Sequence, residues 1–328
     1  MKRFLTLLLI LSFASILSAA RYAGEFLEIG VGPRQLAMGG AVATGDQASS
    51  FYWNPALLSR LRSIEFNAMY VPLFDGLAKY HVAGVAMPIT GAAIGIHWVS
   101  LGVDDIPIWP DYNNLSIEER QQTIRERGGK PIGVTTDRED ALFFTFAKLN
   151  RFTAEFGWSY FSLPIEIPVG LNVKLIRTAL YNKKASGIGV DGGIGMRFSL
   201  NDLLAQKTLG DVNFALVADD FTRTGINWGG GVEDAIPLNL RWGVGYNQPF
   251  PTMKSDFLFE LNTEKKYEYQ VNWGVEYMYD RMLAVRLGQR KGLMAYGAGV
   301  KLWRGTLDYA FQQPELGNQH WIGVTFQF

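Results

Sequence analysis

Three histidines, His81, His97 and His320, are the residues whose chemistry could bind a metal ion. They lie far apart without ligand spacing, and the chain has no cysteine, which excludes thiolate metal sites and disulfides. Asp104 and Asp105 precede a proline-rich stretch and could bind a cation, although a solvated outer loop is the favoured interpretation. We therefore expect no metal site.

Other chemistry also lacks its sequence context. Gly187-x-Gly189-x-x-Gly192 matches a dinucleotide-binding fingerprint by letter, but the residues around it alternate like a strand and no helix follows. The sequence contains no serine-nucleophile elbow with triad partners, so we expect no catalytic residues, no enzymatic activity and no cofactor. Basic and acidic residues are equal at 31 each, which gives no electrostatic reason to expect a nucleic-acid partner.

The charged residues instead occupy alternate positions of extended segments. Val271, Trp273, Val275, Tyr277 and Tyr279, for example, alternate with polar residues, which is the period of a strand with two unlike faces. One face is rich in glycine with isolated charges, as suits a crowded lumen, and the other carries Trp and Tyr like an interfacial girdle. The predicted lumen charges are Asp191, Arg197, Arg241, Glu276, Arg286 and Asp308. We expect Arg286 and Asp308 to tolerate polar replacement better than the lipid-facing Val275 tolerates charge.

The alternation predicts an all-β protein, a transmembrane antiparallel barrel of about 14 strands. Long outer loops are expected at 102–139, 220–236 and 313–318, with a short charged helix at 115–127 that is solvated, caps the barrel mouth or contacts a partner. Residues 153–162 also read as a strand, and whether they form a membrane strand is left open. The candidate strands are 64–72, 79–88, 91–101, 140–148, 165–178, 187–198, 211–219, 237–246, 255–263, 269–279, 282–290, 293–302, 305–312 and 319–328.

Both ends of the sequence indicate export to the outer membrane. Lys2 and Arg3 precede an apolar run from Phe4 to Leu17, so residues 1–20 are predicted to be a cleaved signal peptide. The last candidate strand ends in an aromatic residue, the form that barrel assembly machinery recognises. Its predicted insertion signal is Ile322, Val324, Phe326 and Phe328, all on one face.

Residues 21–62 lack a strand pattern and are predicted to form an N-terminal plug in the lumen of a barrel spanning 63–328. Glycine pairs and an Asn-Pro turn suit backbone packed tightly inside something. The stretches Met38-Gly39-Gly40-Ala41, Asp46-Gln47-Ala48-Ser49-Ser50 and Tyr52-Trp53-Asn54-Pro55-Ala56 resemble the start of the PorV/PorQ family, and Asn-Pro-Ala resembles the broader FadL-type fatty-acid channels. The predicted plug motif is Gly39, Gly40, Asp46, Asn54, Pro55 and Ala56.

Later stretches also resemble PorV/PorQ: Gly274-Val275-Glu276-Tyr277 through Arg286-Leu287-Gly288, and the ending from Leu307-Asp308-Tyr309-Ala310-Phe311 to Leu316-Gly317-Asn318. The resemblance is good at both ends and poor over 102–236. It implies a fourteen-stranded plugged barrel with one of two roles. FadL-like members pass hydrophobic molecules into the membrane through a lateral opening, whereas PorV-like members bind cargo proteins of the type IX secretion system. Outer-membrane lipid, barrel assembly machinery and either hydrophobic molecules or secreted cargo are the expected partners.

Overall fold

The computed structural model describes residues 24–328 except 127, 129, 156–161, 207 and 316. The predicted signal peptide, residues 1–20, lies outside the described residues. No helix in the described part of the chain is both long enough and apolar enough to span a membrane.

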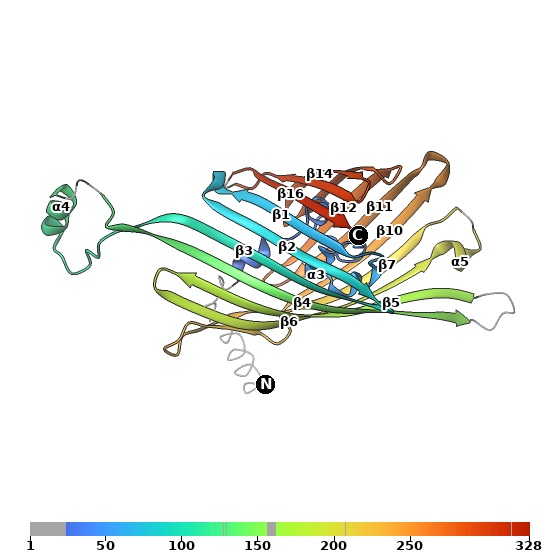
Figure 1. Ribbon diagram of the computed structural model, residues 1–328, viewed down its shortest axis with the longest axis horizontal. Helices are drawn as coiled ribbons and strands as arrows, with labels where there is room; N and C mark the ends of the chain where they lie inside the picture. Colours follow the sequence, from blue (N-terminus) through green and yellow to red (C-terminus); the bar gives the residue numbers. More distant parts are fainter. Residues whose placement is uncertain (1–23, 127, 129, 156–161, 207, 316) are drawn as a thin grey trace, which may run out of the picture.

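Fourteen antiparallel strands form a closed ring, which confirms the predicted fold class (Figure 1). Each strand pairs with its neighbours along the ring, β1 pairs with β16, and the additional β5–β6 pairing completes the closure. Closure leaves no open strand edge, as a barrel within lipid requires. The ring consists of β1 (Glu65–Leu73), β2 (Ala78–Ile89), β3 (Ala92–Ile108), β4 (Gly133–Glu155), β5 (Ser162–Leu180), β6 (Lys183–Ser199), β7 (Asp211–Asp219), β10 (Asn239–Phe250), β11 (Ser255–Lys265), β12 (Tyr269–Tyr279), β13 (Leu283–Arg290), β14 (Leu293–Leu302), β15 (Gly305–Gln312) and β16 (Gln319–Gln327).

The two faces of the wall differ as the alternation predicts. Leu240 and Val285 are exposed on the outside, whereas their neighbours Arg241 and Arg286 are buried inside. Trp98 faces outward with Asp140 and Arg138 beside it, at the outer margin of the apolar surface. A closed barrel with an apolar exterior and charged interior is the bacterial outer-membrane type.

The outer segments contain more strand than the sequence pattern suggested. Instead of a loop over 102–139, β3 and β4 continue as a hairpin beyond the barrel, with α4 (Ile117–Glu126) at its tip as predicted (Figure 1). Asp104 and Asp105 therefore lie in β3, where the pairing with β4 shifts between Val103 and Ile106. The segment 220–236 likewise contains β8 (Thr224–Asn227) and β9 (Glu233–Ile236).

The structure describes only the two ends of the additional candidate strand, 153–162, because residues 156–161 lie outside the described part of the chain. Residues 153–155 continue β4 and residue 162 begins β5, so neither end belongs to a separate strand. The long inner connection 199–210 contains a short helix, α5 (Leu200–Leu204), and short 3₁₀ turns η3 (Phe74–Gly76) and η4 (Pro251–Met253) join two of the hairpins.

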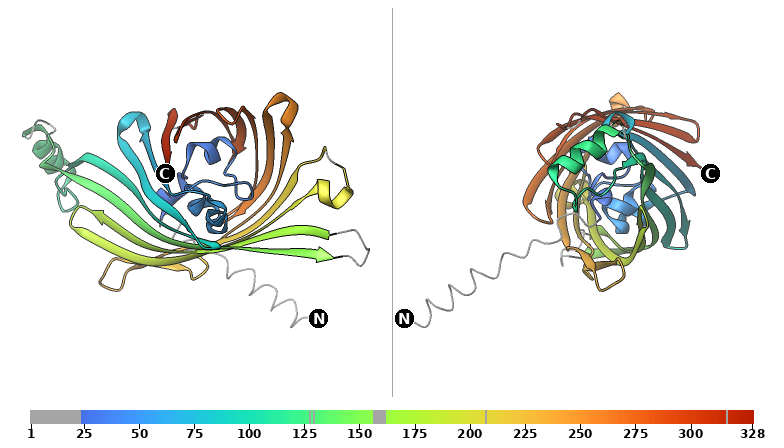
Figure 2. Two further views of the ribbon diagram at one scale, coloured as in Figure 1. Left: turned by 45° about the vertical axis from the view of Figure 1, so that its right-hand side comes forward. Right: turned by 90° about the vertical axis from the view of Figure 1, so that its left-hand side faces the viewer.

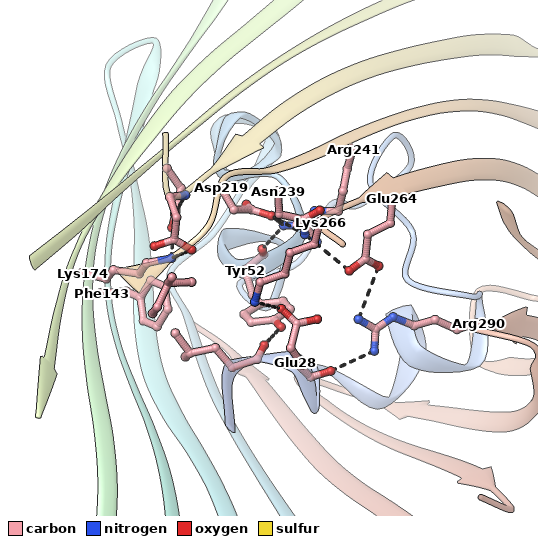
Figure 3. Close-up of a pocket in the computed structure, with 14 residues that line it drawn as sticks. Glu28, Tyr52, Phe143, Lys174, Asp219, Asn239, Arg241, Glu264, Lys266 and Arg290 are labelled. Carbon is pink, nitrogen blue, oxygen red and sulfur yellow. Dashed lines mark hydrogen bonds and ion pairs between the residues drawn. The ribbon is translucent and has the colours of Figure 1, made fainter. Parts of the chain in front are cut away.

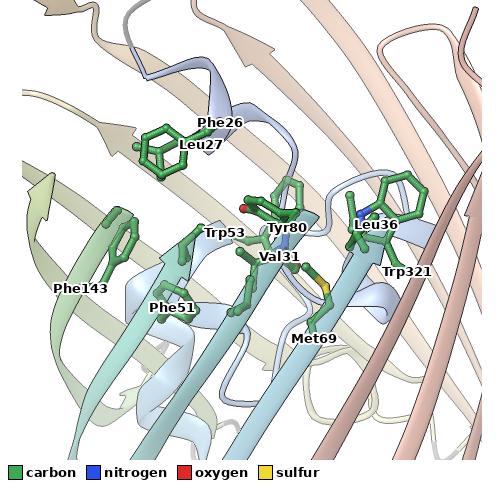
Figure 4. Close-up of a cluster of buried hydrophobic side chains, with 14 of the residues drawn as sticks. Phe26, Leu27, Val31, Leu36, Phe51, Trp53, Met69, Tyr80, Phe143 and Trp321 are labelled. Atoms are coloured by element: carbon green, nitrogen blue, oxygen red, sulfur yellow. Dashed lines mark hydrogen bonds between the residues drawn. The ribbon is translucent and has the colours of Figure 1, made fainter. Parts of the chain in front are cut away.

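Residues 24–61 lie inside the barrel (Figure 2). This plug comprises η1 (Glu25–Glu28), α2 (Pro33–Ala37), α3 (Ser50–Trp53) and η2 (Pro55–Arg60). Its apolar side chains pack against inward side chains of the wall. This packing is favourable because it removes apolar surface from water. The cluster combines Phe26, Leu36, Phe51 and Trp53 of the plug with Met69, Tyr80, Phe143 and Trp321 of the wall (Figure 4).

Glycines on the inner face of the wall allow the plug backbone to approach the strands directly. A Cβ atom added to Gly274 would lie 2.3 Å from the carbonyl oxygen of Met38. Gly39 in the plug has a φ of 72°, a left-handed conformation that favours glycine, and faces the backbone of Trp273. The glycine-rich inner face is thus the surface on which the plug packs.

Candidate functional site

A chain of buried ion pairs joins the plug to the wall. Arg34 of α2 donates from Nε and Nη2 to the two carboxylate oxygens of Glu276, at 2.9 and 2.8 Å. Arg286 donates to the same carboxylate at 2.5 Å and to Asp308 at 2.7 Å. Burial opposes the charge on Arg34, but Glu276 and Asp46 hold the pKa of its guanidinium well above the ordinary value. Three of the predicted lumen charges therefore form one network that holds the plug.

This network gives a physical reason to expect a lower tolerance at Arg286 and Asp308 than the sequence pattern suggested. The side chain of Arg286 is only 2% exposed and that of Asp308 only 5%. A neutral replacement of either residue leaves a buried charge with fewer partners, which costs more than replacing a hydrated lumen residue. Polar substitution at these positions is therefore expected to be damaging.

A second carboxylate holds the plug backbone. Glu260 of β11 is fully buried and accepts hydrogen bonds from the backbone amides of Val42, Ala43 and Thr44, and from the Thr44 hydroxyl. Sequence reasoning missed this residue. Its inward position, two residues before Asn262 in an alternating strand, is the signal that could have identified it.

The plug motif contacts the wall at several separate points. Asn54 Oδ1 accepts from the amide of Ala56 at 3.0 Å and so caps η2, while its Nδ2 donates to the carbonyl oxygen of Val42. A Cβ added to Gly193 of β6 would meet Asn54 Oδ1 at 2.1 Å, and one added to Gly170 of β5 would meet the backbone nitrogen of Ala56 at 2.5 Å. Asp46 pairs with Arg34, so the motif lies partly on the ion network and partly on β5 and β6.

The remaining predicted residues lie apart from one another. Arg197 pairs with Asp211 near the inner ends of β6 and β7. The predicted insertion signal lies on the lipid-facing surface of the barrel, away from the lumen. Its four side chains are exposed there: Ile322, Val324, Phe326 and Phe328. His97 is buried against Phe51, with ring centroids 3.9 Å apart, whereas His81 lies beside Tyr70 and His320 beside Tyr309. Among the described residues, no group of three or more metal-ligating side chains comes together.

Toward the outer end, ionic contacts surround the first turn of the plug (Figure 3). Glu28 accepts from Lys266 at 2.6 Å and from Lys291 at 2.7 Å. Burial opposes ionisation of Glu28, but the neighbouring cations hold its pKa well below the ordinary value. Arg241 pairs with Asp219 at 2.5 Å and donates to the carbonyl oxygen of Tyr52 at 3.1 Å.

The regular wall is interrupted between β6 and β7. The β6–β7 ladder ends at the pair Gly192–Ala218, and β6 next pairs with β8 at Gly187–Ile226. Five steps along β6 are thus matched by eight steps from β7 to β8, which places three extra residues in a bulge. We call this region, β6 residues 188–191 facing residues 219–225, the wall break. A backbone hydrogen bond from Phe221 N to Val190 O, at 3.1 Å, crosses it.

A depression and a cavity lie on opposite sides of the wall at this break. The lipid-side depression measures about 430 Å³ and exists because Gly192 and Ala218 supply little side chain; it is lined by Phe146, Val169, Gly170, Leu171, Gly192, Gly193, Ile194, Leu216 and Ala218. The lumen cavity measures about 30 Å³, and its lining includes Lys174, Asp191, Asp219 and Asp220 (Figure 3). Asp191 and Gly192 are adjacent in sequence, as are Ala218 and Asp219, so a single layer of backbone separates the two spaces.

Sequence comparison found no protein-family model and no characterised protein that matches this chain. Solved structures that align with it are outer-membrane proteins. The P. putida toluene transporter TodX aligns with a TM-score of 0.46 and 11% identity, covering 91% of this chain and 99% of TodX. The monoaromatic hydrocarbon channel CymD gives 0.46 and 10%, covering 92% and 98%, and Acinetobacter baumannii Omp33 gives 0.42 and 7%, covering 81% and 98%. At these identities the alignments concern the fold alone.

Proposed function

We propose that this chain is a non-enzymatic outer-membrane barrel, of FadL-like PorV/PorQ type, that passes hydrophobic molecules laterally between its lumen and the membrane at the wall break. The observation that carries the proposal is the lipid-side depression directly opposite the lumen cavity. A hydrophobic molecule leaving the lumen there would enter the bilayer without crossing the charged plug network. The plug obstructs the axial route, and both apolar packing and buried ion pairs hold it to the wall.

The depression has the character of a hydrophobic contact site. Phe146, Leu171 and Leu216 surround the bare backbone of Gly192, and each is about half exposed on the lipid-facing side. On this lipid-facing side an apolar molecule meets only apolar side chains and hydrocarbon, so no desolvation of polar groups opposes its entry into the bilayer.

The proposal is tested by uptake of the apolar dye N-phenyl-1-naphthylamine into Gram-negative cells that express the protein, measured by the rise in dye fluorescence. Gly192→Leu fills the depression and is expected to slow protein-dependent uptake several-fold. Gly305→Leu is the matched control, because Gly305 is also a wall glycine with ordinary φ and has room for a Cβ, its nearest neighbour being 3.6 Å away. Uptake equal to that of cells without the protein, or unchanged by Gly192→Leu, contradicts the proposal.

The projecting β3–β4 hairpin favours the second candidate, binding of secreted cargo as a component of type IX secretion. Trp109, Ile132 and Val134 are more than half exposed on it, beyond the barrel, and α4 stands at its tip. Purification of the protein from native membranes, with and without residues 109–132, separates the two roles. Protein cargo lost with the hairpin supports the second role, whereas hydrophobic molecules retained without it support the first.

A further inference from the structure

The wall break is held closed from the lumen side by one buried cluster. Lys174 of β5 extends its ammonium group between Asp191 of β6 and Asp220 of the bulge, at 2.8 Å from each. The three side chains are between 4% and 6% exposed. Asp220 is therefore tied to the regularly paired part of the wall by a cation from the neighbouring strand, across the place where the register pairing of β6 is interrupted.

Further contacts orient the bulge within this cluster. The amide of Asp220 donates to Asp191 Oδ1 at 2.9 Å, and the hydroxyl of Thr224 donates to Asp220 Oδ1 at 2.5 Å. Asp220 has a φ of 54°, a left-handed conformation that Asp and Asn tolerate better than most residues. The cluster thus fixes both the start of β8 and the turn that follows β7.

The same cluster is connected to the plug. Nδ2 of Asn172 donates to the carbonyl oxygen of Phe51 at 2.8 Å and to Asp191 Oδ2 at 3.3 Å. Movement of α3 would remove the first of these partners and loosen the side chain that supports Asp191. The position of the plug and the state of the wall break are therefore physically linked.

We propose that Lys174, Asp191 and Asp220 form a latch that keeps the wall break closed, and that release of Asp220 lets the bulge and β8 move away from β6. The proposal rests on the proposed lateral passage, since it assigns that passage its closing element. The lumen cavity, at about 30 Å³, has room for only about two or three waters when the latch is closed. Opening the break would join this cavity to the lipid-side depression.

The test uses the absence of cysteine from the chain, because a single introduced thiol is then the only reactive one. Ile226→Cys places the reporter on β8, where Ile226 is buried against the wall beyond the break. Asp220→Asn removes the charge of the latch while keeping a residue that tolerates the left-handed backbone. We expect this change to accelerate labelling of Ile226→Cys by a water-soluble maleimide about tenfold or more, the effect of losing a charge-assisted hydrogen bond.

Two matched controls separate latch opening from general loosening. Asp211→Asn removes an ion pair between the same two strands at their inner ends and is expected to leave labelling of Ile226→Cys unchanged. Val217→Cys lies just below the break, is equally buried and is paired on both sides, so Asp220→Asn is expected to leave its labelling slow. Heat-modifiable gel mobility verifies that each variant barrel has assembled.

A disulfide supplies the opposite perturbation. Ser186 and Asn227 are direct partners in the β6–β8 pairing, so Ser186→Cys with Asn227→Cys can lock β8 to β6 and be released by reductant. Locking is expected to lower dye uptake reversibly, and Asp220→Asn to raise it. Unchanged labelling of Ile226→Cys in Asp220→Asn overturns the latch, even if dye uptake by the native protein is normal. Faster labelling without any protein-dependent uptake instead preserves the latch and overturns lateral passage.

Discussion

Replacing Glu276 with Gln tests whether the plug is held by buried charge. Glu276 is 3% exposed and neutralises two guanidinium groups, Arg34 from the plug and Arg286 from the wall. Glutamine has nearly the same shape, but it leaves Arg34 with the exposed Asp46 as its remaining ionic partner. Removing one member of a buried ion pair costs about 3–5 kcal/mol, so Glu276→Gln should destabilise the plugged barrel by about that amount.

The matched control is Asp104→Asn, which removes an ion pair to Lys79 that lies on the exterior with both side chains about half exposed. An exposed pair contributes about 1 kcal/mol or less. Guanidinium unfolding of the purified proteins in detergent micelles, followed by heat-modifiable gel mobility and tryptophan fluorescence, gives both free energies of unfolding. A loss for Glu276→Gln that is no larger than the loss for Asp104→Asn would refute the assignment of the network as the anchor of the plug.

Three further predictions concern the wall, the plug contact and the outer mouth. Val285→Lys should cost about 2–4 kcal/mol because Val285 faces lipid, whereas Val285→Leu should be nearly neutral in the same unfolding assay; equal effects would contradict the face assignment. Gly274→Ala should displace residues 37–40 of the plug at a cost of about 1–3 kcal/mol, because the added Cβ would overlap the Met38 carbonyl. The displacement should appear as faster amide hydrogen exchange of residues 37–40. Gly102→Ala is the control and should show no change, because a Cβ at Gly102 has open space around it. Glu28→Gln should speed exchange of residues 24–28 about tenfold at neutral pH. Because the pKa of Glu28 is depressed in the folded state, the stabilisation that Glu28 gives the plug is present above the ordinary pKa of 4.5 and is lost as pH falls below it. The exchange rate of the native protein should therefore approach that of the variant in acid. Equal exchange rates of the two proteins at neutral pH would count against the contact.

Strand existence and the sidedness of the wall could be predicted from the sequence because they depend on local alternation. A residue such as Glu276 flanked by Val275 and Tyr277 must face the opposite side from its neighbours in any strand, and apolar positions prefer lipid. The fourteen predicted strands are therefore confirmed. Strand ends were predicted less well, since β3 and β4 continue as a polar hairpin beyond the membrane, where alternation of apolar residues is no longer required.

The contacts of the lumen were decided only by the tertiary structure. Arg34 and Glu276 are 242 positions apart, and nothing local to either residue specifies which inward carboxylate meets the plug. Glu260 was missed for the same reason, because its partners are backbone amides of a segment that has no strand pattern.

The wall break depends on register, which the alternating pattern does not encode beyond the choice of face. The sequence by itself determined a barrel with a glycine-rich, charged interior and a separate N-terminal segment, because each of these follows from residue type and local spacing. Only folding decided that Asp220 meets Lys174 and that Gly192 leaves a depression outside the same point. Both depend on a three-residue offset between β7 and β8 along β6, which arises when strands distant in sequence are paired in three dimensions.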